Sequence, residues 1–243
     1  MSDWFTLGDA TWPAARLHPA GAFLVREGAG GGNRVSAATL ADPGWSKKDL
    51  EAAEAAQAGL GQPALFMIRP GDEALDAELA ARGYVVKDPV RIYAGSTASV
   101  AEPPPPFLAT FALWPPLAIM DELWEEGGIG PARRAVMARV AGPRTALLGR
   151  IEDRAAGVAF AAIHDGSAMI HALWTAPRLR RKGVAAHLAR AAAAWAHAAG
   201  AHRLALLVTE ANTAANALYA SLGMEAVGRY HYRIKPPGET GSS

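Results

Sequence analysis

Residues 175–199 read TAPRLRRKGVAAHLARAAAAWAHAA, and this stretch decides the fold. An apolar strand is predicted to end near Thr175, because Pro177 disfavours its continuation. The basic turn Arg180–Lys182 follows, and Gly183 then opens a long alanine-rich helix. The first amides of a helix have no intrahelical acceptor and lie at the positive end of the helix dipole. The stretch therefore predicts a strand, a loop and a helix that can hold a diphosphate.

A second strand and helix follow about 25 residues further on. Residues 203–209, RLALLVT, are almost continuously apolar, which is typical of a strand buried on both faces. Residues 210–224, EANTAANALYASLGM, predict a helix in which Asn212 is a good N-cap and Gly223 a good C-terminal stop.

Both segments resemble motifs of the GNAT acetyltransferases. Residues 180–185, RRKGVA, resemble the family's R/Q-x-x-G-x-G/A loop, which holds the pyrophosphate of acetyl-CoA. Residues 212–223, NTAANALYASLG, are similar to the family's N-x-x-A-x-x-L-Y-x-x-x-G segment. The two motifs come in the family's order and at its separation, and the resemblance extends over about residues 107–234.

The resemblance implies an α/β (α+β) acyl-CoA N-acyltransferase fold, a mixed twisted sheet flanked by helices. It also implies that acetyl-CoA is the co-substrate. In the family the asparagine that opens the second helix contacts the coenzyme, and the tyrosine of the same helix lies near the thioester sulfur. The residues expected to bind the coenzyme are Leu173, Trp174, Thr175, Arg180, Arg181, Lys182, Gly183, Val184, Ala185, Asn212 and Tyr219.

The N-terminal half repeats this pattern at an offset of 140 positions. Residues 64–86 fall on residues 204–226, so that strand, loop, helix and glycine stop recur. The repeat is degenerate, because Leu79 stands where the other half has Tyr219, and Asp42–Trp45 replaces the basic loop. We therefore expect two GNAT-like halves, of which the first binds no coenzyme. A chance recurrence of a common strand–helix–strand unit is the alternative.

These features predict a domain organisation. Residues 1–98 are expected to form the degenerate half and residues 107–235 the catalytic N-acetyltransferase domain. Residues 99–106 form a proline-rich linker, and residues 236–243 are expected to be a disordered tail.

Further elements are predicted from local patterns. In the second half we expect helices near 115–126 and 131–141, strands at 144–151, 157–163 and 168–175, and a hairpin turn at 164–167. Residues 28–33, GAGGGN, are expected to form a hairpin loop between strands within 22–27 and 34–40. A dinucleotide-binding loop is excluded there, because such a loop must open a helix.

Composition narrows the class of protein. The formal net charge is +1, so no overall attraction to nucleic acid or to a membrane is expected. The sequence has no cysteine, which excludes disulfides, thiolate metal sites and a cysteine nucleophile, and its histidines show no metal-binding spacing. The first residues, MSDWFTLGD, do not resemble a secretory signal, and no apolar run predicts a membrane span. We expect a cytoplasmic monomer or homodimer that acts on a small-molecule amine without a metal.

Acetyl transfer to an amine needs a base, a donor to the developing oxyanion and a proton donor for the leaving thiolate. Tyr219 is the candidate proton donor, since a phenol stays protonated at neutral pH; a packed core tyrosine is the alternative. A backbone amide around Leu173–Thr175 is the candidate oxyanion donor. Some GNAT members have a glutamate where Met169 stands, and His171 lies two residues on, on the same face of the strand. His171 is therefore the candidate base, and a packed or substrate-lining histidine is the alternative.

Four further residues are expected to line the acceptor site: Trp124, Glu125, Trp174 and Tyr230. Core packing of the aromatics and a solvated helix end at Glu125 are the alternatives. The predicted function is N-acetyl transfer directly from acetyl-CoA to an amine. Amino acids, polyamines, aminoglycosides and a protein N-terminus all stay open as acceptors. A non-catalytic acyl-CoA-binding or regulatory protein is the alternative function.

Overall fold

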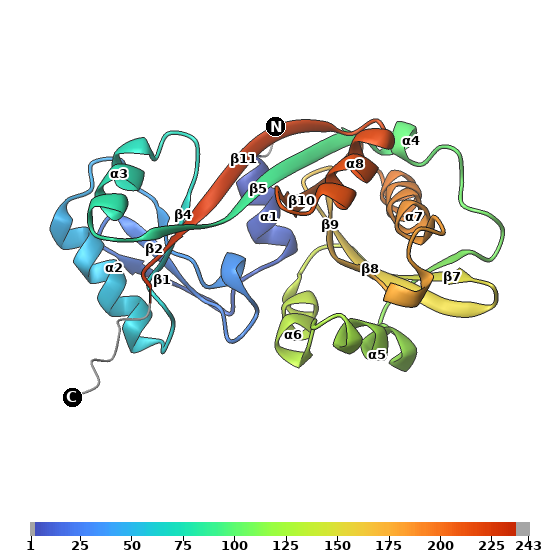
Figure 1. Ribbon diagram of the computed structural model, residues 1–243, viewed down its shortest axis with the longest axis horizontal. Helices are drawn as coiled ribbons and strands as arrows, with labels where there is room; N and C mark the ends of the chain where they lie inside the picture. The colour runs from blue at the N-terminus through green and yellow to red at the C-terminus, as the bar shows by residue number, and fades with distance from the viewer. Residues whose placement is uncertain (1–2, 237–243) are drawn as a thin grey trace. The chain divides into compact units, whose positions relative to one another are not determined.

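The computed structural model describes residues 3–236, which form two compact units. Unit 1 comprises Met1–Pro13, Arg91–Val208 and Asn212–Gly228, and unit 2 comprises Ala14–Val90, Thr209–Ala211 and Arg229–Ser243. The long strands β5 (Val85–Ser96) and β11 (Glu225–Ile234) contribute residues to both units (Figure 1). Residues 91–98 therefore pack in unit 1 and not with the rest of the predicted N-terminal half. Apart from Pro236, the predicted tail lies outside the described residues.

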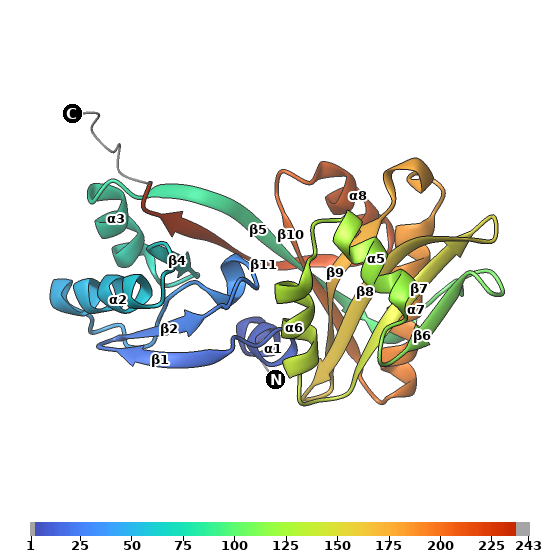
Figure 2. The same ribbon diagram turned by 90° about the horizontal axis from the view of Figure 1, so that it is seen from below.

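Unit 1 is a sheet with helices on both faces (Figure 2). Its strands are β6 (Thr110–Leu113), β7 (Arg144–Ile151), β8 (Arg154–His164), β9 (Ser167–Thr175) and β10 (Arg203–Thr209). Its helices are α1 (Trp4–Thr11), α4 (Thr97–Val100), α5 (Ala118–Glu126), α6 (Pro131–Arg139), α7 (Val184–Ala198) and α8 (Thr213–Ser221). The hydrogen-bonded order of the strands is β4-β11-β5-β10-β9-β8-β7-β6, and β4 (Leu65–Ile68) belongs to unit 2.

Alternate residues of β9 face different helices, as the two-residue period of a strand requires. Ala168 and Ile170 pack in the hydrophobic cluster that contains the buried side of α7, whereas Met169 packs against Leu7 of α1. Figure 2 shows α5 and α6 on the side of the sheet opposite α7. The strand β9 thus has two buried faces, which explains its largely apolar sequence.

Two glycines let α7 approach the sheet. A Cβ added to Gly157 would lie 2.8 Å from the carbonyl oxygen of Trp174, 3.0 Å from Cγ1 of Val184 and 3.2 Å from Cδ1 of Leu188. A Cβ added to Gly149 would lie 3.0 Å from the same valine methyl. The first two turns of α7 therefore rest directly on the backbone of β7 and β8.

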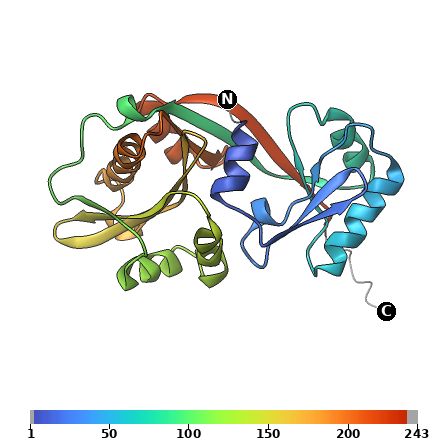
Figure 3. The same cartoon turned by 180° about the vertical axis from the view of Figure 1, so that it is seen from behind.

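Unit 2 has a separate core around α2 (Lys47–Gly59) and α3 (Glu73–Ala81). The strands β1 (Arg16–Ala20), β2 (Phe23–Glu27) and β3 (Thr39–Leu40) form an antiparallel sheet, and Figure 3 shows β1 and β2, in blue, beside α2, in cyan. Aromatic rings meet edge to face in this core: Phe23 with Phe66 at 5.7 Å and Phe66 with Tyr84 at 5.8 Å.

The segment after the glycine-rich loop differs from the prediction. A strand was expected within residues 34–40, but Asn33–Val35 form a 3-10 turn and only Thr39–Leu40 pair with β2. The hydroxyl of Ser36 donates to the carbonyl of Gly32 at 3.0 Å, which holds the chain in the turn. Local side-chain bonds of this kind compete with strand pairing, and the alternation of the sequence carries no sign of them.

The predicted repeat is visible in the structure. The helix α8 spans the positions that α3 spans, shifted by 140, and β5 and β11 begin at equivalent residues. Gly83 and Gly223 end the two helices with φ of +82° and +75°, a conformation that favours glycine. The last strands are exchanged, however. The end of β11 pairs antiparallel with β4, and β5 is the neighbour of β10, so each repeat's last strand joins the first strand of the other repeat.

Most predicted elements of the C-terminal half are confirmed. The strand at 203–209 is β10, the predicted alanine-rich helix is α7, and the turn at 164–167 joins β8 to β9. The strand predicted at 157–163 begins earlier, at Arg154. Within residues 3–236, none of the helices combines the length and apolarity that crossing a bilayer requires.

Candidate active site

The basic loop lies between the end of β9 and the start of α7. Pro177–Leu179 form a 3-10 turn, and Gly183 takes φ of +83° directly before the helix. The guanidinium of Arg180 donates from Nε to the carbonyl of Thr175 at 3.2 Å, and Lys182 Nζ lies 2.7 Å from Glu152 Oε1. Arg181 is exposed and makes no ion pair with any residue in the part of the chain that is described. The loop thus gathers cationic side chains around a helix start.

The N-terminus of α7 differs from its counterpart in unit 2. No side chain caps α7, so its first amides have no side-chain acceptor. The equivalent helix α2 has a complete capping box, in which Ser46 and Asp49 each accept from the other's backbone amide. The hydrogen bonds from Ser46 lower the pKa of Asp49. An ionised carboxylate therefore stands at the start of α2, where the start of α7 has amides without a side-chain acceptor. Only the helix start in unit 1 therefore suits an anionic ligand.

The strands β9 and β10 separate next to this loop. Their parallel pairing runs from Arg203–Ser167 to Leu206–Ile170 and ends there, although β9 continues to Thr175. A β-bulge shifts the register of β8 against β9 at this point, and Ala172 takes φ of +50°. The edge of β9 that faces β10 is consequently unpaired over the last residues of the strand, which include the predicted oxyanion donors.

Tyr219 lies in α8, within the same hydrophobic cluster as the start of α7. Its side chain is 6% exposed, and its ring lies 6.1 Å from that of Tyr93. Burial raises the pKa of Tyr219 to about 12. Its hydroxyl makes no hydrogen bond to any residue within 3–236. The phenol is thus held neutral and keeps its proton for a ligand.

A family model, described as the acetyltransferase (GNAT) family, matches residues 115–224, which contain the loop, the separated strands and α8. A protein of Bacillus subtilis (strain 168), described as the uncharacterized N-acetyltransferase YobR, is 27% identical over 238 residues. That match covers 94% of this chain and 96% of the relative. Residues 115–224 thus match the GNAT family, and the chain is similar to an uncharacterized N-acetyltransferase over most of its length.

Solved GNAT structures have the same fold at low sequence identity. A GCN5-related N-acetyltransferase from Kribbella flavida has a TM-score of 0.66 and 21% identity, over 96% of this chain and 93% of that one. A tandem GNAT protein from the clavulanic acid biosynthesis pathway has a TM-score of 0.59 and 14% identity, over 82% of this chain and 74% of that one. The chain therefore has the mixed α/β fold of these GNAT structures, as predicted, and it is built from two units.

His171 is buried, with 3% of its side chain exposed, between Trp12 and Phe160. Its Nε2 lies 2.9 Å from the hydroxyl of Thr11, and that hydroxyl donates its one proton to the carbonyl of Leu7 at 2.6 Å. The Thr11 oxygen must therefore accept from His171, so the imidazole carries its proton on Nε2. As predicted, His171 shares the face of Met169, but it is packed against α1.

Three of the predicted acceptor residues, Trp124, Glu125 and Trp174, lie around the end of α5. Trp124 is fully buried, and its indole donates to the carbonyl of Ala172 at 2.9 Å, so it fixes the bulge in β9 from the core. Glu125 is exposed and forms an ion pair with Arg134 at 2.8 Å. The ring of Trp174 packs on the backbone of α5's end, where a Cβ at Gly127 would lie 2.6 Å from it.

Tyr230, the fourth predicted acceptor residue, lies in unit 2. Its side chain is 6% exposed, and its hydroxyl lies 3.4 Å from that of Tyr232. Unit 1 holds the other three, so a role for Tyr230 at the acceptor site stays a prediction.

Asn212 is the N-cap of α8, as predicted, because its side-chain oxygen accepts a hydrogen bond from the amide of Ala215 at 3.1 Å. Sequence reasoning missed Asn216, which accepts a hydrogen bond from the hydroxyl of Tyr93 at 3.2 Å. These two residues are 123 positions apart, and the strand exchange brings them together. No local pattern in the sequence could have indicated this contact.

Two polar atoms beside the loop are buried without a hydrogen-bond partner among residues 3–236: Oγ1 of Thr175 and Nδ1 of His187. Burial, and then the charge of Arg190, lower the pKa of His187. The ring is close to the helix start, since a Cβ at Gly183 would lie 3.5 Å from its Nε2. A hydroxyl, an imidazole and uncapped amides therefore lie near the segment that joins β9 to α7, and uncapped amides at a helix start are suited to an anion.

Proposed function

We propose that this protein transfers an acetyl group from acetyl-CoA directly to the amine of a small molecule. The observation that carries the proposal is the uncapped start of α7, with its three cationic neighbours, placed directly after the unpaired end of β9. Bound acetyl-CoA would supply the activated acyl group as a thioester.

The residues present fit that co-substrate. The amides of Gly183–Ala185 and the cations at 180–182 suit its diphosphate, and the orphaned hydroxyl of Thr175 offers a further hydrogen bond. The unpaired edge of β9 can pair with an amide-bearing ligand as a strand would. The equivalent place in unit 2 has Asp49 at its helix start, so we expect a single coenzyme site per chain.

The chain's own residues suit two of the three chemical tasks. The hydroxyl of Tyr219 keeps its proton across the neutral range and can give it to the leaving sulfur. The unpaired edge of β9, from Ala172 to Thr175, offers backbone amides that can donate a hydrogen bond to the oxyanion. The sequence has no cysteine to carry the acetyl group, which favours direct transfer.

His171 is the candidate base, and only its second ring nitrogen, Nδ1, can take up a proton. Because Nε2 donates to Thr11, any proton acceptance by this ring falls to Nδ1. The same bond, with Met169 in place of an acidic residue, favours the second candidate function, a non-catalytic acyl-CoA-binding protein. The two candidates share the coenzyme site and differ in turnover.

A thiol-release assay separates them. Acetyl-CoA is incubated with the full chain and a panel of amino acids, polyamines and aminoglycosides, and free thiol is followed with a chromogenic disulfide. We expect release above the rate without amine for at least one member. Calorimetric binding of acetyl-CoA without release for any amine would favour the non-catalytic function, and absence of binding would overturn both.

A further inference from the structure

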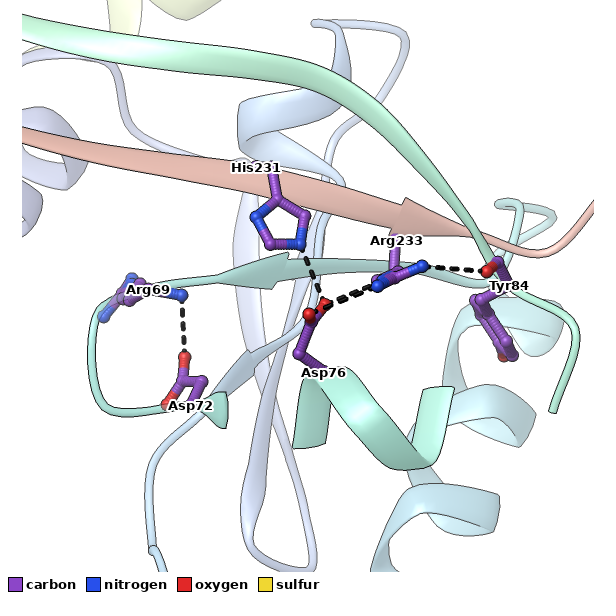
Figure 4. Close-up of polar contacts among 6 residues, drawn as sticks. All are labelled: Arg69, Asp72, Asp76, Tyr84, His231 and Arg233. Atoms are coloured by element: carbon purple, nitrogen blue, oxygen red, sulfur yellow. Dashed lines mark hydrogen bonds and ion pairs between the residues drawn. The ribbon is translucent and has the colours of Figure 1, made fainter. Parts of the chain in front are cut away.

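Unit 2 contains a cavity of about 410 Å³ that the acetyl-transfer site does not use. Residues from the end of β4, the start of α3, and the unit 2 parts of β5 and β11 line it, and all of these residues belong to that unit. A cavity of this volume lies within the range of small-molecule sites, about 300–1,000 Å³. Figure 4 shows three of the side chains that line it: Arg69, Asp76 and His231.

One wall is a fixed ionic network. Asp76 accepts from His231 Nε2 at 2.8 Å and from Arg233 Nε and Nη2 at 2.7 and 3.2 Å (Figure 4). Arg233 also donates to the carbonyl of Tyr84 at 3.2 Å. The arginine's hydrogen bond is the main reason why the pKa of Asp76 is lowered. The Asp76 carboxylate is thus already neutralised, and it orients the wall without being available to a ligand.

The repeat shows that this wall has been altered. Shifted by 140 positions, Asp76 corresponds to Asn216, and Arg233 corresponds to Tyr93. The neutral pair of unit 1, joined at 3.2 Å, is therefore an ion pair in unit 2. Unit 2 therefore has charged groups next to a cavity at the positions where unit 1 has a neutral contact.

Two opposite charges on the cavity wall, Arg229 and Glu73, form no ion pair with any of the described residues. Arg229 of β11 is exposed. Glu73, at the first turn of α3, accepts from the backbone amide of Gly71 at 3.1 Å and has no side-chain partner among residues 3–236. That hydrogen bond lowers the pKa of Glu73, so it is ionised at neutral pH. One guanidinium and one carboxylate are therefore open to a ligand.

Two further charged residues, Arg69 and Glu210, line the wall, and each already has a partner within the protein. The rest of the wall is apolar: Ile68, Pro70, Val86, Pro89 and Val90 contribute aliphatic surface, and Tyr230 contributes its ring. A simple anion would leave the Glu73 carboxylate beside it without a counter-ion, and a simple amine would leave the Arg229 guanidinium without one. A ligand that has a carboxylate, an ammonium group and an apolar body is complementary to the guanidinium, the carboxylate and the apolar part of the wall.

We propose that unit 2 binds an apolar α-amino acid as its zwitterion in this cavity, with its carboxylate on Arg229 and its ammonium group on Glu73. The site is distinct from the coenzyme site and does not depend on acetyl transfer. It gives the degenerate half of the chain a ligand of its own.

The test is equilibrium binding to the full chain in the absence of acetyl-CoA. Calorimetry with each of the protein amino acids at about 5 mM detects any site whose dissociation constant lies below about 1 mM. We expect binding by at least one aliphatic or aromatic member. For leucine, the matched probes are 3-methylbutylamine, which lacks the carboxylate, and 4-methylpentanoic acid, which lacks the amine. Both should bind at least tenfold more weakly, since each loses one charge-assisted contact.

Substitutions of the two charged cavity residues test whether the amino acid binds in unit 2. Arg229→Gln and Glu73→Gln should each weaken amino-acid binding by about ten- to hundredfold, whereas Arg16→Gln and Glu51→Gln, which change exposed residues outside the cavity wall, should not. Because the two cavity residues are exposed, the variants should keep the melting temperature of the wild type, and this is measured alongside. Binding by no amino acid overturns the proposal. Undiminished binding by either leucine analogue, or by both cavity variants, overturns it as well.

Discussion

Replacing Tyr219 with phenylalanine isolates one hydroxyl. The hydroxyl makes no hydrogen bond within the described residues, and the ring remains to fill its place in the cluster. Folding stability should therefore stay close to that of the wild type. If the phenol protonates the leaving sulfur, kcat should fall by about 10²- to 10⁴-fold, which corresponds to roughly 2.7–5.4 kcal/mol of transition-state stabilisation.

The neighbouring tyrosine is the matched control. Tyr93 lies 6.1 Å from Tyr219, and its hydroxyl donates to Asn216 at 3.2 Å. Tyr93→Phe should lose about 0.5–1.5 kcal/mol of stability with that bond, or roughly 1–6 °C in Tm. It should leave kcat largely unchanged. We thus expect Tyr219→Phe to lower kcat with little change in stability, and Tyr93→Phe to lower stability with little change in kcat.

The assay is steady-state thiol release on an identified acceptor, with thermal melts of the same preparations. The pH profile adds a second readout. Burial raises the pKa of Tyr219 to about 12, which favours the protonated form, so this group should give no basic limb below about pH 11. An unchanged kcat in Tyr219→Phe would refute the assignment. Equal rate losses in both variants would show that packing of the tyrosine pair, and not proton donation, is what matters.

Further substitutions test the rest of the structure. Gly183→Glu should abolish acetyl-CoA binding by calorimetry, and Gly183→Ala, which shares the backbone strain at φ +83° without the charge, should bind more tightly than it. Gly157→Ala should lose about 1–3 kcal/mol and lower Tm by roughly 2–12 °C, whereas Gly59→Ala, which meets open space in a helix, should not destabilise. Asp76→Asn should remove a stabilisation that is present above the unfolded carboxyl pKa of about 3.9 and lost as pH falls below it, so acid melts should converge. A 107–243 fragment lacks β5 and should be neither stable nor active by circular dichroism and thiol release.

Local signals made the loop and the two helices beside it predictable. Gly183 must adopt a positive φ, Asn212 must cap, and Gly223 must stop a helix, and each requirement is visible in a few neighbouring residues. The repeat was visible for the same reason, because strand, helix and glycine recur at one offset. Neighbouring residues alone are therefore enough to predict the basic loop and the start of α7.

Long-range contacts were not predictable. Nothing near Ala172 indicates its φ of +50° or the bulge that ends the pairing of β9 with β10. The environment of His171 depends on Thr11, which is 160 positions away. Trp124 was expected to line the acceptor site, with core packing as the alternative, and its indole donates to the carbonyl of Ala172, 48 positions away. In each case the decisive partner is distant in sequence.

The strand exchange gives each repeat a structural role in the other. Tyr93 of the first repeat contacts α8 through Asn216, and Arg233 of the second repeat contacts α3 through Asp76. Each helix is therefore held by a strand of the other repeat, and β5 lies beside β10 whether or not the first repeat binds a ligand. In unit 2 an ion pair stands where unit 1 has the neutral contact, and Asp76 of that pair lines the cavity for which we propose an amino-acid ligand.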